Sequence, residues 1–214
     1  MTRLTRRALA LGLAALPLPA FAARPVIAPL SADDRLLVDK AATYLQGLTE
    51  AKGRFVQTDA RGTSTQGTVY LKRPGKARFA YEAPSGLLVV ADGANVSVAD
   101  SRLKTFDRYP LMATPLSIFL ARQIKLDRGV VISDVTRLAD GFTITARDGK
   151  KQAEGQITLT FSNSPMALIG WTVSDAQGQA TRIRLTGLQP TSGLAPTLFV
   201  LNDPRPKSVG RGKM

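Results

Sequence analysis

The sequence predicts a mainly β, α+β protein: an unclosed antiparallel β half-barrel with a helical lid over an apolar cavity. Residues 67–100 alternate apolar and polar side chains between turn signals, which is typical of paired strands. About ten such strand patterns follow one another along the chain, and only two stretches have helical periodicity. A sheet this long curls, and its single apolar face requires cover from the helices.

The strands within residues 67–100 are separated by the turns Pro74-Gly75 and Asp92-Gly93 and by a turn at residues 84–86. Pro and Gly preset the backbone angles of turns, so neighbouring strands pair locally. Alternation assigns every second side chain to the apolar face, which is the expected wall of the cavity. The cavity residues predicted from these strands are Val69, Leu71, Phe79, Tyr81, Leu88, Val90, Val96 and Val98.

The first 22 residues have the pattern of a secretory signal peptide. Three arginines precede an apolar run that is too short to span a bilayer, and Ala20-Phe21-Ala22 fits a cleavage site. The pair Arg6-Arg7 leaves both the Sec and the twin-arginine export routes open. The predicted organisation is a cleaved leader at 1–22, one half-barrel domain at 23–201 and a basic flexible tail at 202–214.

The formal charge of the whole chain is +13, from 29 basic and 16 acidic residues. The leader holds Arg3, Arg6 and Arg7 and no acid, so 26 basic residues remain against 16 acidic ones, which leaves +10. Such a charge favours anionic partners: nucleic acid, an anionic membrane or an acidic protein surface. Because the basic residues are spread along the chain, a solvated surface explains them equally well.

The first helix is predicted from Ser31 onward. Ser31 precedes Asp33 and Asp34, which is the pattern of a helix start with acids in its first turn. An apolar stripe follows at helical spacing, formed by Leu37, Ala41, Tyr44, Leu45 and Leu48. We expect this stripe to pack against the sheet, and a strand at residues 54–60 to follow.

The second helix is predicted after Pro110, with Thr114 as its cap and Pro115 at its first position. Its apolar stripe consists of Met112, Leu116, Phe119 and Leu120. The stripe is either ordinary core or a mobile cover over an apolar cavity, because a proline-bounded helix in a long sheet connection resembles a lid. In the second case these four residues line the cavity.

Strand patterns return from Gly129 to the end of the domain, and a last strand is expected at residues 198–201. Trp171 alternates with polar or small neighbours and shares a face with Ile169 and Val173. This places Trp171 among the predicted cavity residues.

The chain contains no His and no Cys. This excludes thiol chemistry, disulfides, imidazole-dependent catalysis and most zinc, copper and haem sites. Aspartates that precede glycine, such as Asp140 and Asp148, fit hairpin turns better than acid–base roles. The prediction is a protein that is not an enzyme and needs no cofactor or metal. Aromatic residues make up only 6%, and this together with an extracytoplasmic location disfavours nucleic-acid binding.

Arg73 lies between the end of a strand and Pro74. One interpretation is a solvated turn residue. The other is a positioned guanidinium whose five donors reach backbone carbonyls of the covering helices.

Several segments resemble the periplasmic lipoprotein carrier (LolA) family in order and spacing, over nearly the whole chain that follows the leader. They are RFVQ at 54–57, GTVYLKRPGK at 67–76, RFAYE at 78–82, VADG at 90–93 and TPL at 114–116. The resemblance implies an unclosed barrel whose cavity holds the acyl chains of lipoproteins in transit. It also implies a lid held shut by the arginine at the position of Arg73.

The function implied by this resemblance is a periplasmic chaperone that carries acylated lipoproteins from the inner to the outer membrane. The implied partners are the cargo, an inner-membrane ABC-type lipoprotein release complex and, where present, an outer-membrane receptor lipoprotein, and a monomer is expected. The alternative is a periplasmic carrier or sensor of another amphiphile, such as a free lipid or glycolipid. An enzyme acting through carboxylates requires a pair of inward-facing acids, which the strand patterns lack.

Overall fold

The computed structural model of the chain describes residues 29–124, 129–149 and 155–203. The predicted leader and residues 204–214 of the predicted tail lie outside these ranges. Within them, no helix combines the length and the apolar character needed to cross a membrane.

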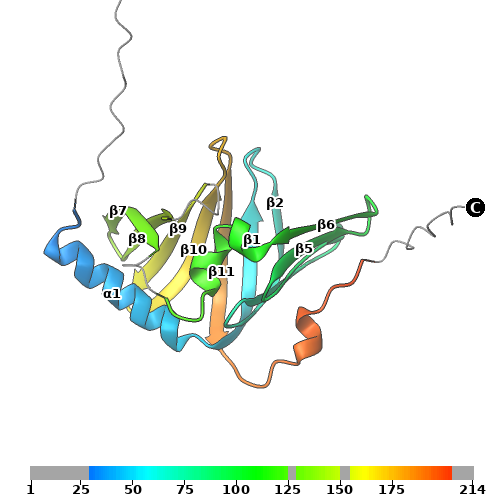
Figure 1. Ribbon diagram of the computed structural model, residues 1–214, viewed down its shortest axis with the longest axis horizontal. Helices are drawn as coiled ribbons and strands as arrows, with labels where there is room; N and C mark the ends of the chain where they lie inside the picture. Colours follow the sequence, from blue (N-terminus) through cyan, green and yellow to red (C-terminus); the bar gives the residue numbers. More distant parts are fainter. Residues whose placement is uncertain (1–28, 125–128, 150–154, 204–214) are drawn as a thin grey trace, which may run out of the picture.

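In the described part of the chain, eleven antiparallel strands form one curled sheet (Figure 1). The first meander consists of β1 (Glu50–Thr58), β2 (Ser64–Lys72), β3 (Lys76–Tyr81), β4 (Leu87–Asp92), β5 (Asn95–Asp100) and β6 (Thr105–Pro110). The second consists of β7 (Val130–Leu138), β8 (Gly141–Asp148), β9 (Gln156–Asn163), β10 (Met166–Ser174) and β11 (Ala180–Pro190). Pairing of β1 with β11 joins the two meanders.

The edges of the sheet are β6 and β7, which do not pair with each other. The barrel is therefore unclosed, and the predicted fold class is confirmed. Residues paired across neighbouring strands share a face, so the register defines a concave apolar face and a convex face. Phe55, Val69 and Phe79 lie on the concave face through the pairs Gly53↔Val69 and Val69↔Phe79.

Helix α1 (Ala32–Gly47) covers the concave face on the side of β7 to β10 (Figure 1). The predicted start is confirmed, because the Ser31 hydroxyl accepts a hydrogen bond from the Asp34 amide at 3.1 Å. Val38, Ala41 and Leu45 are its buried residues. The ring of Tyr44 meets the ring of Phe161 on β9 edge-on, with the ring centres 6.2 Å apart.

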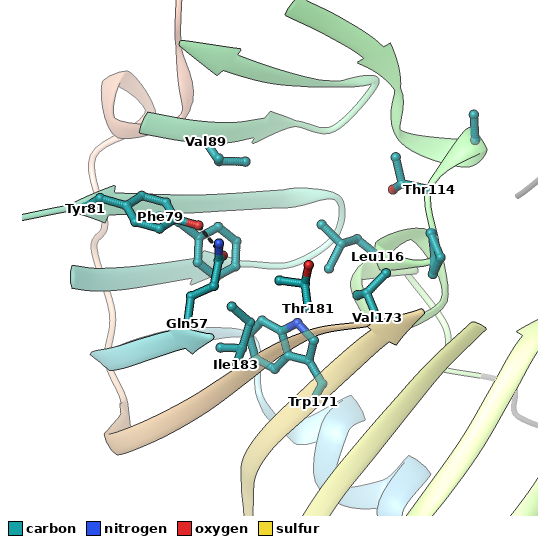
Figure 2. A pocket seen from close by; sticks show the side chains of 12 residues that line it. Gln57, Phe79, Tyr81, Val89, Thr114, Leu116, Trp171, Val173, Thr181 and Ile183 are labelled. Atoms are coloured by element: carbon teal, nitrogen blue, oxygen red, sulfur yellow. Dashed lines mark hydrogen bonds between the residues drawn. The ribbon is translucent and has the colours of Figure 1, made fainter. Parts of the chain in front are cut away.

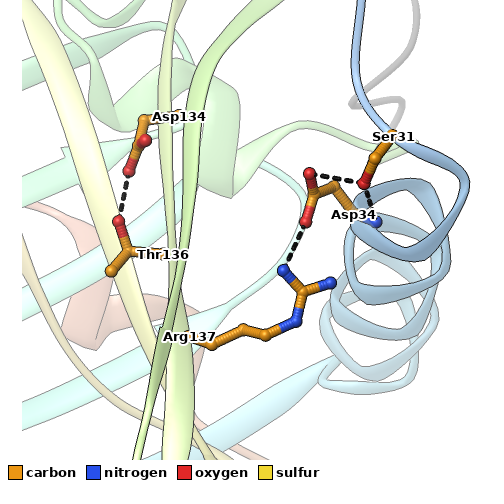
Figure 3. A network of polar contacts seen from close by, with 5 residues as sticks. All are labelled: Ser31, Asp34, Asp134, Thr136 and Arg137. Atoms are coloured by element: carbon orange, nitrogen blue, oxygen red, sulfur yellow. Dashed lines mark hydrogen bonds and ion pairs between the residues drawn. The ribbon is translucent and has the colours of Figure 1, made fainter.

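A polar contact fastens the first turn of α1 to the edge strand β7 (Figure 3). Arg137 Nη1 lies 2.8 Å from Asp34 Oδ1, and the Ser31 hydroxyl donates to the other carboxylate oxygen at 2.7 Å. The hydrogen bond from Ser31, and after it those from Arg137, lower the pKa of Asp34 despite some desolvation. A lowered pKa means that this contact stabilises the fold at neutral pH and is lost as the pH falls through the folded-state pKa.

The chain leaves one edge of the sheet at β6 and re-enters at the other edge with β7, so it must cross the open side. We call residues 111–124 of this crossing the lid. The lid contains the 3₁₀ helix η1 (Leu111–Ala113) and the short helix α2 (Leu116–Leu120). The predicted cap was wrong: Pro115 occupies the N-cap position, and the Thr114 hydroxyl donates instead to the Leu111 carbonyl at 2.8 Å, at the end of η1.

The predicted strand at residues 198–201 was also wrong. Residues 191–203 cross the convex face as an irregular segment with the 3₁₀ helix η2 (Pro196–Phe199). Their carbonyls bond to basic side chains of that face rather than to a strand: Lys72 donates to Leu194, Arg78 to Leu198 and Arg108 to Leu201. Phe199 is buried here, so this segment forms a second, smaller core outside the barrel.

Gly67 allows an aromatic cluster to form on the concave face. It pairs with Phe55 on one side and with Tyr81 on the other. Because Gly67 has no side chain, the two rings meet across β2 edge-on, with their centres 4.9 Å apart. A Cβ at this position would lie 2.2 Å from the Ala80 carbonyl oxygen and 2.9 Å from the Phe55 ring.

We expect Gly67→Ala to lower the free energy of unfolding by about 1–3 kcal/mol, because backbone must move to admit the methyl group. Chemical denaturation monitored by circular dichroism measures the change. Gly47→Ala is the matched control, since an added Cβ there meets nothing within 4 Å. Equal stability of the two variants would contradict this account of the cluster.

Candidate functional site

A cavity of about 350 Å³ lies between the concave face and the lid (Figure 2). This volume falls within the range of ~300–1,000 Å³ that is usual for ligand sites. Its lining comes from strands of both meanders and from the lid. The lining residues are Gln57, Phe79, Tyr81, Val89, Ala113, Thr114, Pro115, Leu116, Trp171, Val173, Thr181 and Ile183.

Trp171 connects the sheet with the lid. It is only 2% exposed, and its ring lies 5.9 Å from that of Phe79 and 5.5 Å from that of Phe119 on α2. Movement of the lid therefore changes the surroundings of Trp171. Since it is the single Trp of the chain, its fluorescence reports directly on the cavity.

Four of the predicted cavity residues lie in the lining: Phe79, Tyr81, Leu116 and Trp171. Four others are buried in the adjoining core rather than facing the space: Val69, Leu71, Phe119 and Leu120. Val96 and Val98 lie on the concave face and pack against this core, but outside the lining.

Leu88 and Val90 lie on the convex face, which corrects their prediction as cavity residues. Val89 pairs with Phe79 and Val98, so it is Val89 that faces the cavity. Four consecutive apolar residues in β4 conceal the alternation, because Val90 is itself buried on the side that η2 covers. Met112 is also misplaced: its side chain is 58% exposed.

Other lining residues were missed by the sequence analysis. Val173 and Ile183 lie in strands with clear alternation. The sequence did not show that these strands face the same cavity as Phe79. Gln57 shares a face with Phe55 but is polar, and Thr181 precedes the apolar part of β11. A polar residue on an otherwise apolar face was the available signal.

Arg73 connects the two helical covers. Its guanidinium donates to the Leu45 carbonyl in the last turn of α1 and, at 2.6 Å, to the Ala121 carbonyl just after α2. The amide of Gly75 donates to the Leu120 carbonyl at 2.8 Å, so the β2–β3 turn holds the end of α2 twice. Both side-chain acceptors lie at helix ends, where the partial negative charge of the helix favours a cation.

The hydrogen bonding of Arg73 is incomplete. Its Nε is buried and has no hydrogen-bond partner among the described residues. Burial also lowers the pKa of this guanidinium, which shows that the charged form is partly desolvated. For Arg73 itself, two strong hydrogen bonds thus stabilise the closed lid and one unsatisfied donor opposes it. Gln46 of α1 adds two more bonds to the closed lid: its side chain donates to the Arg122 carbonyl at 3.2 Å and accepts from the Ile124 amide at 3.0 Å.

The fold and the site together define a β half-barrel with a lidded apolar cavity, which is the architecture of a binding protein. The described residues contain no cluster of acids that could hold a metal ion. The family described as "Outer membrane lipoprotein carrier protein LolA" matches residues 46–202, and the chain belongs to this family.

Two curated relatives cover almost the whole chain. The outer-membrane lipoprotein carrier protein of Pseudomonas syringae pv. syringae is 28% identical over 97% of this chain and 98% of its own. That of Chromobacterium violaceum is 27% identical over 98% and 96% respectively. A putative outer membrane lipoprotein-sorting protein domain from Vibrio parahaemolyticus has a similar structure with a TM-score of 0.48 and 11% identity, over 76% of this chain and 94% of that domain.

We expect Val89→Phe to weaken binding of a palmitoylated probe about tenfold or more, because the ring fills part of the cavity. Titration followed by the fluorescence of Trp171 measures the affinity. Leu88→Phe is the control, since it places the same side chain one residue away on the convex face. If Leu88→Phe were the more damaging variant, the register of β4 would be wrong.

Proposed function

We propose that this protein is a periplasmic chaperone that carries acylated lipoproteins from the inner to the outer membrane. The observation that carries this proposal is an apolar cavity closed by a lid that Arg73 ties to α1. Membership in the LolA family and the names of the curated relatives support it. The signal-peptide pattern at the start of the chain supports the location.

The proposed cargo explains why an enclosed cavity is needed. Each buried methylene contributes about 0.8 kcal/mol, so an acyl chain does not leave a membrane for water unaided. The cavity of about 350 Å³ lies near the lower end of the range of ~300–1,000 Å³ that is usual for sites that hold one small ligand. An anchor with two or three chains therefore requires the lid to move outward.

Release follows from the same movement. Cargo binds the open lid, and the hydrogen bonds of Arg73 form only when the lid is closed. Closure and cargo therefore compete, which weakens net binding and favours transfer to an acceptor. In this mechanism the inner-membrane release complex loads the carrier, and an outer-membrane receptor or the membrane itself accepts the cargo.

Native mass spectrometry tests the proposal directly. The protein without its leader is incubated with inner-membrane vesicles that carry labelled lipoproteins and the release complex. A one-to-one complex with an acylated lipoprotein is the expected result. Binding of a free lipid or glycolipid alone would replace the proposal with a carrier of another amphiphile, and the absence of any bound amphiphile would refute both.

We expect Arg73→Leu to retain its cargo, because the lid loses the two charged hydrogen bonds that favour closure. The measurement is transfer of a bound, labelled lipoprotein to outer-membrane vesicles, and we expect at least a tenfold slower rate, equivalent to about 1.4 kcal/mol.

Arg78→Leu serves as the control for this experiment. Arg78 lies on the next strand and also donates to a carbonyl, that of Leu198 in the segment 191–203, but it does not contact the lid. Its transfer rate should match that of the unmodified protein. We call the hydrogen bonds from Arg73 to α1 and the lid the latch. Normal release by Arg73→Leu would refute the role of the latch while leaving the carrier function in place.

A further inference from the structure

Four polar side chains line the apolar cavity, and three of them come from the sheet rather than from the lid. Gln57 from β1, Tyr81 from β3 and Thr181 from β11 all line it (Figure 2). The Tyr81 hydroxyl donates to Gln57 Oε1 at 2.5 Å. Figure 2 shows this pair on the opposite side of the cavity from Leu116 of the lid.

The hydrogen bond from Tyr81 leaves a donor available. It occupies the oxygen of the Gln57 side chain, so the amide nitrogen Nε2 is the group that remains. Neither Gln57 Nε2 nor the Thr181 hydroxyl has a hydrogen bond to another described residue, and neither is sealed in the core. Donors that line an apolar cavity without internal partners are available to a ligand carbonyl.

A second, polar pocket of about 200 Å³ adjoins this side of the cavity. It lies between the β1–β2 and β10–β11 hairpins, which project from the same end of the sheet (Figure 1). Val173 and Thr181 line both spaces, so the two lie side by side. The remaining lining residues are Asp59, Ala60, Arg61, Asp175 and Gln179.

The charge of the polar pocket is unbalanced. It presents two carboxylates, Asp59 and Asp175, against the single guanidinium of Arg61. Each carboxylate uses one oxygen, Oδ1, to accept backbone amides of its own turn, which fixes its position. This arrangement favours a neutral or cationic polar group over a phosphate.

We propose that the cavity binds an acyl chain in one direction, with the carbonyl at the head of the chain accepting hydrogen bonds from Gln57 Nε2 and the Thr181 hydroxyl. The neutral or cationic head of the amphiphile occupies the polar pocket between the hairpins. The hydrocarbon tail extends toward Val89, Leu116 and the rest of the lid. This inference rests on the proposed function and adds to it the orientation of the cargo.

The orientation has a consequence for a lipoprotein. Its acyl ester groups sit beside a glyceryl-linked peptide, which is the polar part of the anchor. The folded part of the cargo then emerges past residues 58–64 and 174–180, at the end of the sheet away from Arg73. Entry of the chains and release of the latch are thereby separated in space.

A pair of probes with the same tail tests the carbonyl site. Monopalmitoylglycerol has an ester carbonyl, and its hexadecyl ether analogue lacks it. We expect the unmodified protein to prefer the ester about tenfold, measured by the fluorescence of Trp171. Gln57→Leu and, separately, the near-isosteric Thr181→Val should each lower the affinity for the ester about three- to tenfold. The affinity for the ether should stay unchanged.

Gln66→Leu is the matched control, because Gln66 lies on β2 outside the cavity and donates to Glu82. It should keep the full preference for the ester. Equal binding of ester and ether, or an unchanged preference in both variants, would overturn the carbonyl site while leaving the carrier function intact. Failure of the unmodified protein to bind either probe would count against the cavity as an acyl site and so against both proposals.

Two further ligands test whether the bound ester belongs to a lipoprotein anchor or to a phospholipid. They are a diacylglyceryl lipopeptide and an ester-linked lysophosphatidylglycerol. We expect tighter binding of the lipopeptide, and Asp59→Asn with Asp175→Asn should reduce that difference. Preference for the anionic lysolipid would overturn the assignment of the polar pocket to a neutral or cationic head.

Discussion

An unclosed sheet leaves its apolar concave face exposed, and the rest of the structure follows from this constraint. Because β6 and β7 do not pair, the chain must cross the open side to continue from one edge to the other. The crossing supplies the lid, and α1 covers the remaining part of the face. Neither cover fills the space completely, since α2 has only five residues. The space left between the concave face and the lid is the cavity.

The covers are tied together near the end of α1, by Arg73 and by Gln46, whose side chain bonds to the lid backbone. Arg73 lies in the turn between two central strands, from which its side chain reaches the end of α1 and the end of the lid. The C-terminal ends of helices carry partial negative charge, so one cation serves both. At the opposite end of the sheet, the polar groups near Gln57 and Thr181 make no such tie. The half-barrel thus has a latched end and a polar end, which gives the cavity a direction.

Much of the fold was predictable because it is local. Turn residues and alternation determined the hairpins, and Ser31 marked the start of α1. The site was less predictable, since it depends on which face each strand presents. The apolar run at residues 87–90 carries no alternation, and the segment 191–203 makes both faces of β4 apolar. Gln57 was not predicted to line the cavity, because alternation selects apolar positions. What distinguishes Gln57 is its hydrogen bond with the hydroxyl of Tyr81, 24 positions away in the chain.

The latch that we propose is balanced rather than strong. Two hydrogen bonds from a charged donor contribute about 1.5–3 kcal/mol each, less where solvent screens them, and an unsatisfied buried donor costs about 1–3 kcal/mol. The difference is comparable to burying a few methylenes at ~0.8 kcal/mol each. A fully satisfied Arg73 would hold the lid against incoming cargo, and a solvated one would not compete with bound cargo. In the proposed mechanism, the orphaned Nε brings the open and closed states close enough in free energy for acyl chains to shift the balance between them.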